Sequence, residues 1–182
     1  MNTVAETRPE ISLVLPAEAL EAIQTYLTSV YLAPSLLPFD LHLLPVKEGL
    51  TFADDLLRVT ALPNTHMSGN FAYNHLRAEY PQLQLQSYSY ATEVEGKKIV
   101  FSGDITTLDE LNPLLQGAEL LIVEVAHYDP RGLGSFVKHL DAERIVLTHI
   151  HPGLESLLGD LVAEWKDPRI SIAHDGLRIP LS

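Results

Sequence analysis

The chain has no cysteine among its 182 residues. Structural disulfides and thiolate metal sites are therefore excluded, and any metal ion must be held by histidine, aspartate or glutamate. No apolar run approaches the roughly 20 residues that a helix needs to span a bilayer. The opening segment, MNTVAETRPE, also lacks the basic-then-apolar pattern of a secretory signal. We therefore expect a cytoplasmic protein with no membrane partner.

Basic residues are also scarce. Twelve Lys and Arg residues stand against 24 Asp and Glu residues, which gives a formal net charge of −12 at pH 7. Such a charge repels polyanions, and no basic cluster interrupts it, so the composition argues against extensive nucleic-acid binding. The chain is long enough to bury the core of one domain. We expect a disordered or frayed start over residues 1–10 and a single α/β domain over residues 11–182.

The hydrophobic pattern predicts strands first and an alternation of strands and helices later. The predicted strands are residues 11–15, 40–46, 51–62, 82–95, 97–101, 119–125, 145–147, 170–173 and 177–180. Helices are predicted over residues 16–31 and 153–165 and after Asp129-Pro130, where Gly132 and Gly134 weaken the pattern. Thr107-x-x-Glu110 is a capping-box signature for a short helical turn.

The stretch IVFSGD, residues 99–104, organises the rest of the chain. Its β-branched and aromatic run predicts a buried strand, and Gly103 would bend the backbone so that Asp104 emerges at the carboxyl end. Open α/β sheets place their chemistry at that edge. The alternative for Asp104 is that its carboxylate caps the next helical turn.

Two other predicted strands end close to histidines. Residues 58–62 precede His66, and residues 144–148 directly precede His149. Two imidazoles and a carboxylate at one sheet edge are a ligand set for zinc or iron, although His66 taken alone could be an ordinary loop histidine. His149 and His151 form an H-x-H, but Pro152 indicates that the strand has ended. We expect His149 to be the ligand and His151 to support the ligands or face the substrate.

A further pair of candidates follows in the motif VEVAH. Glu124 could orient a metal-bound histidine, or it could simply end a strand at the surface. His127 could donate a hydrogen bond or a proton to a leaving oxygen. The candidate catalytic residues are thus His127, Glu124 and His151.

The order of these motifs, THMSGNFAY, KKIVFSGD, AELLIVEVAH, RIVLTHIHP and IAHDGLRI, resembles the C-terminal portion of the metallo-β-lactamase superfamily, in particular its ribonuclease Z-like hydrolases. The resemblance extends from about residue 11 onward. It implies a partial αββα sandwich, mostly the C-terminal sheet and its covering helices. It also implies that His66, Asp104 and His149 are metal ligands, with Asp104 bridging two metal ions.

One family motif is missing from the chain. H-x-H-x-D-H, which should precede this segment, does not occur in the sequence. The resemblance therefore implies an N-terminally incomplete domain. The complete family fold holds up to two metal ions, Zn²⁺ or alternatively Mn²⁺ or Fe, and we expect fewer in this chain.

The resemblance implies a metal-dependent hydrolase, in which a metal-activated water attacks a phosphodiester or a related ester. The acidic charge favours a small-molecule or cyclic phosphodiester over tRNA. The alternative is a catalytically silent half-domain that pairs with a complementing N-terminal half or a second copy, or a truncated remnant. A doubly wound phosphate-binding domain has little support because no G-x-G-x-x-G or P-loop stretch follows a strand.

Overall fold

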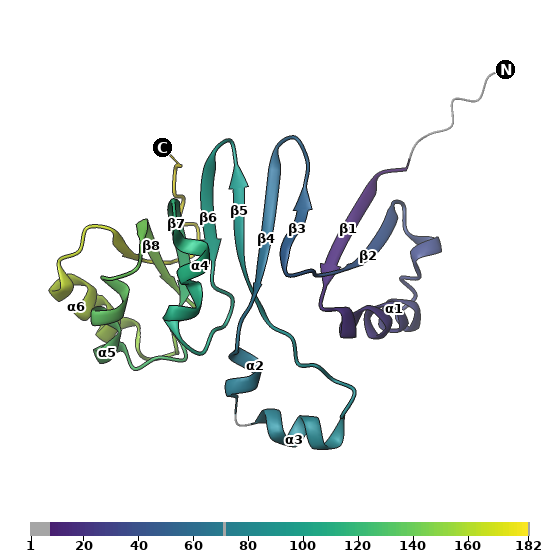
Figure 1. The fold of residues 1–182 in the computed structure, drawn as a ribbon, viewed down its shortest axis with the longest axis horizontal. Helices are drawn as coiled ribbons and strands as arrows, with labels where there is room; N and C mark the ends of the chain where they lie inside the picture. Colours follow the sequence, from purple (N-terminus) through teal and green to yellow (C-terminus); the bar gives the residue numbers. More distant parts are fainter. Residues whose placement is uncertain (1–7, 71, 182) are drawn as a thin grey trace.

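A seven-stranded sheet forms the body of the protein in the computed structural model, which describes residues 8–70 and 72–181. Its strand order is β3-β4-β5-β6-β7-β8-β9, and a two-stranded sheet of β1 and β2 lies beside it (Figure 1). Pairing is antiparallel from β3 to β6 and parallel from β6 to β9. The large sheet is therefore mixed, with its parallel part in the second half of the chain.

The elements have the following bounds. The strands are β1 (Glu10–Leu15), β2 (Asp40–Pro45), β3 (Gly49–Ala53), β4 (Leu57–Pro63), β5 (Tyr88–Val94), β6 (Lys97–Phe101), β7 (Ala118–Glu124), β8 (Ala142–Thr148) and β9 (Ile170–Ile172). The α-helices are α1 (Leu20–Ser29), α2 (His66–Gly69), α3 (Ala72–Glu79), α4 (Asn112–Leu115), α5 (Pro130–Val137) and α6 (Glu155–Trp165). Short 3-10 helices are η1 (Ala17–Ala19), η2 (Pro34–Leu36) and η3 (Leu108–Leu111).

The buried core lies between β6–β8 and the helices α4, α5 and α6. Alternate residues of these strands are fully buried because a strand turns every second side chain to the same face. They include Val100, Leu121, Val123, Ile145 and Leu147. Leu133 of α5 and Leu158 of α6 belong to the same cluster. This layer fixes the carboxyl ends of β6, β7 and β8 relative to one another.

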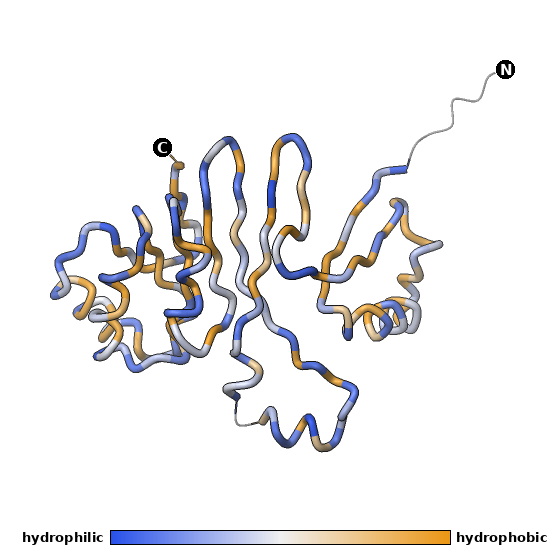
Figure 2. Tube along the Cα trace, viewed as in Figure 1, coloured by the Kyte–Doolittle hydropathy of each residue, from blue (hydrophilic) through white to orange (hydrophobic). Residues whose placement is uncertain are grey.

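The opposite face of the sheet is covered less completely. Phe101 follows Val100 and so points away from the helices, and its side chain is exposed, as is that of Phe52 on β3. A cavity of about 560 Å³ lies between this face and β1, lined among others by Val14, Phe52 and Tyr90. Figure 2 shows hydrophobic segments in β1 and α1 as well as in the core layer. No residue of α1 is buried among those that the structure describes.

The predicted α/β architecture is confirmed, while two predicted strands are wrong in extent. Residues 51–62 form two strands, joined by a turn in which Asp54 accepts hydrogen bonds from the backbone N–H groups of Leu56 and Leu57. The strand predicted over residues 82–95 begins only at Tyr88, after Leu85 has adopted a left-handed φ of 54°. A single left-handed residue interrupts an extended run, which alternation alone does not reveal.

Residues 177–180 do not form the predicted strand. Side chains hold this terminal segment instead: the Arg144 guanidinium donates to the Pro180 carbonyl, and Lys97 Nζ donates to the Leu181 carbonyl. The predicted irregular start, residues 1–10, lies mostly outside the described residues, and Glu10 already belongs to β1. Within the described residues, the helices are too short or too polar to cross a bilayer.

Candidate metal centre

Asp104 reaches the sheet edge because of the glycine before it. Gly103 has φ 59°, and a Cβ atom at this position would lie 2.7 Å from the Tyr88 carbonyl oxygen. Glycine alone accommodates both the left-handed backbone and the close approach, so the predicted bend after β6 is confirmed. The N-cap of the following η3 helix is Thr107. The Asp104 carboxylate instead faces two histidines.

His149 is the first of these histidines. β8 ends at Thr148, and His149 adopts a left-handed φ of 51°. This conformation costs a non-glycine residue on the order of 1 kcal/mol. Its ring Nδ1 lies 3.0 Å from Asp104 Oδ1. The break in the strand thus leaves the His149 ring in hydrogen-bond contact with Asp104.

His66 completes the predicted set of three. It begins α2, just after β4, and its Nε2 lies 3.9 Å from Asp104 Oδ2, with only 17% of the side chain exposed. Its backbone N–H donates to Asn64 Oδ1 at 3.2 Å. The structure therefore brings His66, Asp104 and His149 together at one edge of the sheet.

Glu124 and His127 meet at the same place. Glu124 is 3% exposed, and its Oε1 lies 3.1 Å from His127 Nδ1. The same oxygen accepts the backbone N–H of Ile105 at 3.3 Å, next to Asp104. The surface alternative for Glu124 is therefore wrong. A buried carboxylate bonded to one ring nitrogen fixes the orientation of the imidazole and leaves its other nitrogen free to act.

The His127 ring stands between the other two. Its centroid lies 4.8 Å from that of His66 and 5.8 Å from that of His149. One ligand-type atom from each of Asp104, Glu124, His127 and His149 lies within 4.8 Å of the others. His66 lies outside this set of four, although its Nε2 is 3.9 Å from Asp104 Oδ2. Imidazole nitrogens and carboxylate oxygens at this spacing fit the donor preferences of Zn²⁺, Fe²⁺ and Mn²⁺. The four side chains, together with His66, form a candidate metal centre, which we call the cluster.

His151 is not part of this group. Its side chain is exposed, and its ring Nδ1 lies 2.9 Å from the carbonyl oxygen of Pro152. The left-handed turn at His149 ends the alternation that would have aligned the two histidines. A role for His151 near the substrate stays a prediction.

Two carboxylates, those of Glu124 and Glu110, act on the Tyr128 phenol beside the centre. Burial raises the pKa of the Tyr128 phenol well above its usual range, and the nearby carboxylates of Glu124 and Glu110 raise it further. Burial also raises the pKa of Glu110, but hydrogen bonds from Thr65, Thr107 and Thr106 outweigh this effect and hold it below its ordinary value. Anionic groups close to the cluster favour the presence of a cation.

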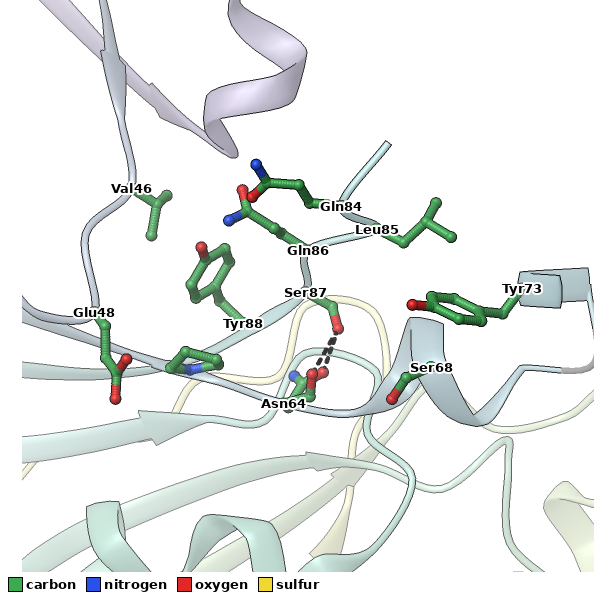
Figure 3. A pocket seen from close by; sticks show the side chains of 11 residues that line it. Val46, Glu48, Asn64, Ser68, Tyr73, Gln84, Leu85, Gln86, Ser87 and Tyr88 are labelled. Atoms are coloured by element: carbon green, nitrogen blue, oxygen red, sulfur yellow. Dashed lines mark hydrogen bonds between the residues drawn. The ribbon is translucent and has the colours of Figure 1, made fainter. Parts of the chain in front are cut away.

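Two cavities flank the loop after β4. One, of about 540 Å³, adjoins the cluster and is lined by His66, Gly69, Asn70, Ile105, Thr106 and His127. The other, of about 440 Å³, is lined by residues that include Asn64, Ser68 and Tyr88 (Figure 3). The two share no lining residue. In Figure 3, the hydroxyl of Ser87 reaches Asn64, to whose Oδ1 it donates at 2.5 Å. Of these two cavities, the first is the one lined by His66 and His127.

The fold and the cluster define a class of protein: a mixed-sheet α/β domain with histidines and carboxylates gathered at one sheet edge. Residues 1–150 match the family model described as "Beta-lactamase superfamily domain". The chain belongs to this metallo-β-lactamase superfamily, and the superfamily that the motifs indicated is confirmed. A sequence search of curated proteins gave no significant match.

Solved structures with the same fold are distant in sequence. They include the metallo-β-lactamase fold protein YhfI from Bacillus subtilis (15% identity, TM-score 0.64, 92% of this chain and 64% of that one). They also include the human short-form tRNase Z (19%, 0.63, 97% and 68%) and Zn²⁺-bound PqqB from Methylobacterium extorquens (16%, 0.64, 97% and 66%). The chain thus spans about two thirds of the length of these structures.

Proposed function

We propose that this domain is a metal-dependent hydrolase in which His66, Asp104 and His149 hold the metal ion. The supporting observation is the meeting of these three side chains, from three separate loops, around the Asp104 carboxylate. Zn²⁺ is the proposed ion, with Mn²⁺ or Fe as alternatives, because the donors are nitrogen and oxygen only. A bound ion would lower the pKa of a water ligand towards about 7 and polarise the scissile group.

Glu124 and His127 form the proposed proton-donating pair. The buried Glu124 carboxylate accepts a hydrogen bond from Nδ1 of the imidazole and stabilises the ring when it carries a second proton on Nε2. In that imidazolium form Nε2 can give its proton to a leaving oxygen, and the ring returns to the neutral form. His127 also lines the cavity beside the cluster, so it can touch a substrate there. His151 is proposed to face the substrate from the following loop.

The proposed substrate is a small-molecule phosphodiester or a related ester. The cavity beside the cluster, of about 540 Å³, falls in the size range of small-molecule sites. The net charge of −12 disfavours a long polyanion. Among proteins of this fold, the human short-form tRNase Z carries in its name an activity on tRNA, but the acidic surface of this chain favours a smaller diester. The proposed location is the cytoplasm.

Hydrolysis of bis(p-nitrophenyl) phosphate tests the proposal. The purified chain, supplied in turn with Zn²⁺, Mn²⁺ and Fe²⁺, should release nitrophenolate, and a chelator should stop the reaction. His149→Ala should lower kcat/KM by more than about 100-fold, because a metal ligand is lost. His75→Ala is the matched control, since this α3 histidine is 82% exposed and is not among the residues grouped at the sheet edge. Equal rates in both variants would contradict the proposal.

A catalytically silent half-domain is the second candidate. One observation favours it: Phe52 and Phe101 are exposed on the sheet face opposite the helices. A complementing N-terminal half or a second copy of the chain would then cover this face. In that case the isolated chain should contain almost no metal. Replacing His66, Asp104 or His149 should leave this metal content unchanged.

A further inference from the structure

We propose that Glu110 is a positioning residue that joins the loop carrying His66 to the loop carrying Asp104 and so sets the distance between these two side chains. This role rests on the proposed function, because it treats His66 and Asp104 as metal ligands. The bridge itself does not depend on that assignment, because every hydrogen bond in it joins two protein groups.

The Glu110 carboxylate makes contacts that its local role does not require. In a capping box, the N3 side chain accepts the N-cap backbone N–H, and Glu110 Oε1 does so from Thr107 at 2.8 Å. Its Oε2, however, accepts the backbone N–H of Thr65 at 2.6 Å, and Oε1 accepts the Thr65 hydroxyl at 3.1 Å. Thr65 lies 45 residues away in the sequence and directly precedes His66.

The two loops need such a bridge because their strands are not neighbours. β5 lies between β4 and β6, so no ladder of backbone hydrogen bonds fixes the end of β4 against the end of β6. A second connection crosses β5 through side chains. Asn64 Nδ2 donates to Ser89 Oγ at 3.2 Å, and Ser89 Oγ donates to the Ser102 carbonyl at 2.6 Å. Glu110 thus connects the same two loops on the solvent-exposed side, beside His66 and Asp104.

The loops approach each other closely beneath this bridge. A Cβ atom on Gly69 would lie 2.6 Å from Thr106 Oγ1. Thr106 also donates its backbone N–H to Glu110 Oε1 at 3.2 Å. His66 and Asp104 lie within a few residues of these contacts, and their facing atoms are 3.9 Å apart. A small shift of either loop would therefore change the spacing of the two side chains.

Glu110→Gln removes the bond from the Thr65 N–H to Oε2 and keeps the bonds that Oε1 accepts from the Thr107 N–H and the Thr65 hydroxyl. Glutamine is accepted at N3 of a capping box, because one carbonyl oxygen can replace Oε1. Its amide nitrogen, in the place of Oε2, is a donor and cannot accept the Thr65 N–H. Glu110→Ala removes both interactions. Asp109→Asn is the control, because it removes a carboxylate from the same short helix at an exposed position that does not reach Thr65.

Amide hydrogen exchange of the metal-free protein is the first measurement. We expect Glu110→Gln to speed exchange at least about tenfold in the segment 64–69, with the cap retained at Thr107, and we expect Asp109→Asn to leave that segment unchanged. Glu110→Ala should speed exchange in both segments. Unchanged exchange at Thr65 in Glu110→Gln would overturn the proposal, whatever the metal content.

Metal affinity is the second measurement. Isothermal titration with Zn²⁺ should give a dissociation constant about 10- to 100-fold weaker for Glu110→Gln than for the unmodified chain, as is typical when a group that orients a ligand is lost. Asp109→Asn should bind as tightly as the unmodified chain. An unaltered constant in Glu110→Gln would overturn the positioning role. Absence of binding in the unmodified chain would refute the proposed function, and the exchange measurement would still decide the bridge.

Discussion

Two glycines of α5 differ in their surroundings and so differ in purpose. A Cβ atom on Gly134 would lie 2.4 to 2.9 Å from the Trp165 indole, whereas one on Gly132 would meet nothing within 4 Å. Gly134 thus lets α5 and α6 pack closely, and Gly132 does not serve this contact. From the sequence, both residues look alike, as weak points of a predicted helix, because nothing local reveals a partner on another helix.

Substitution by alanine should separate the two positions. Gly134→Ala should lower the free energy of unfolding by about 1–3 kcal/mol, since the added methyl group overpacks against Trp165. Gly132→Ala should raise it by about 0.5–1 kcal/mol, because alanine is the better helix former in open space. Chemical denaturation followed by Trp165 fluorescence measures both. A stabilised Gly134→Ala would show that the helices can separate at no cost.

The residues of the metal centre were predictable to different degrees. His149 follows β8 directly, and Asp104 follows β6 after Ser102 and Gly103. The edge of a parallel sheet brings such residues together. His66 was predictable because it lies only a few residues beyond β4. The contact between Glu110 and Thr65 was not, because the capping-box pattern accounts for Glu110 locally and gives no sign of a partner 45 residues away.

At the scale of elements, one arginine connects the end of α5 to the start of β8 and β9. Arg169 donates to the carbonyl oxygens of Lys138, Leu140 and Ala142, and its guanidinium pairs with Asp167 at 2.8 Å. The hydrogen bond from Arg169 holds the pKa of Asp167 below its ordinary value. The short β9 strand thus depends on side-chain contacts as well as on its ladder with β8.

The pH dependence of stability should report this pair. Because the Asp167 pKa is lower in the folded chain, the unfolded chain binds more protons as the solution is acidified, and stability is lost as pH falls from about 4 through the folded pKa. Asp167→Asn should remove this contribution and flatten the profile in that range. Thermal unfolding between pH 2 and 6 measures it, and parallel profiles for the two proteins would contradict the assignment.

The sequence predicts an element well where the element's own residues identify it, and poorly where contacts with other segments decide its structure. β6, β7 and β8 are continuous apolar runs buried on the helix side, so their pattern identifies them. β3 and β4 look like one strand because the turn at Asp54 lies inside a run of strand-like residues. The terminal segment 177–180 has the composition of a strand, yet the Pro180 carbonyl accepts a hydrogen bond from the Arg144 side chain and not from a neighbouring strand.

At the scale of the whole molecule, the mixed sheet delivers the groups of the centre from four separate loops. The loops after β4, β6, β7 and β8 supply His66, Asp104, His127 and His149, respectively. Glu124, at the end of β7, makes a hydrogen bond with the His127 ring. Helices α4 to α6 fix the parallel strands from one side (Figure 1). The centre therefore needs the folded sheet and cannot form on any single segment.

Metal content per chain tests the central claim most directly. After equilibrium dialysis against trace Zn²⁺ and Mn²⁺, elemental analysis of the chain should find about one metal ion per molecule. Asp104→Asn and His149→Ala should each reduce this value towards zero, while His75→Ala should not. A value near zero in the unmodified chain, or one that stays the same when Asp104 and His149 are replaced, would contradict a metal centre at this edge of the sheet.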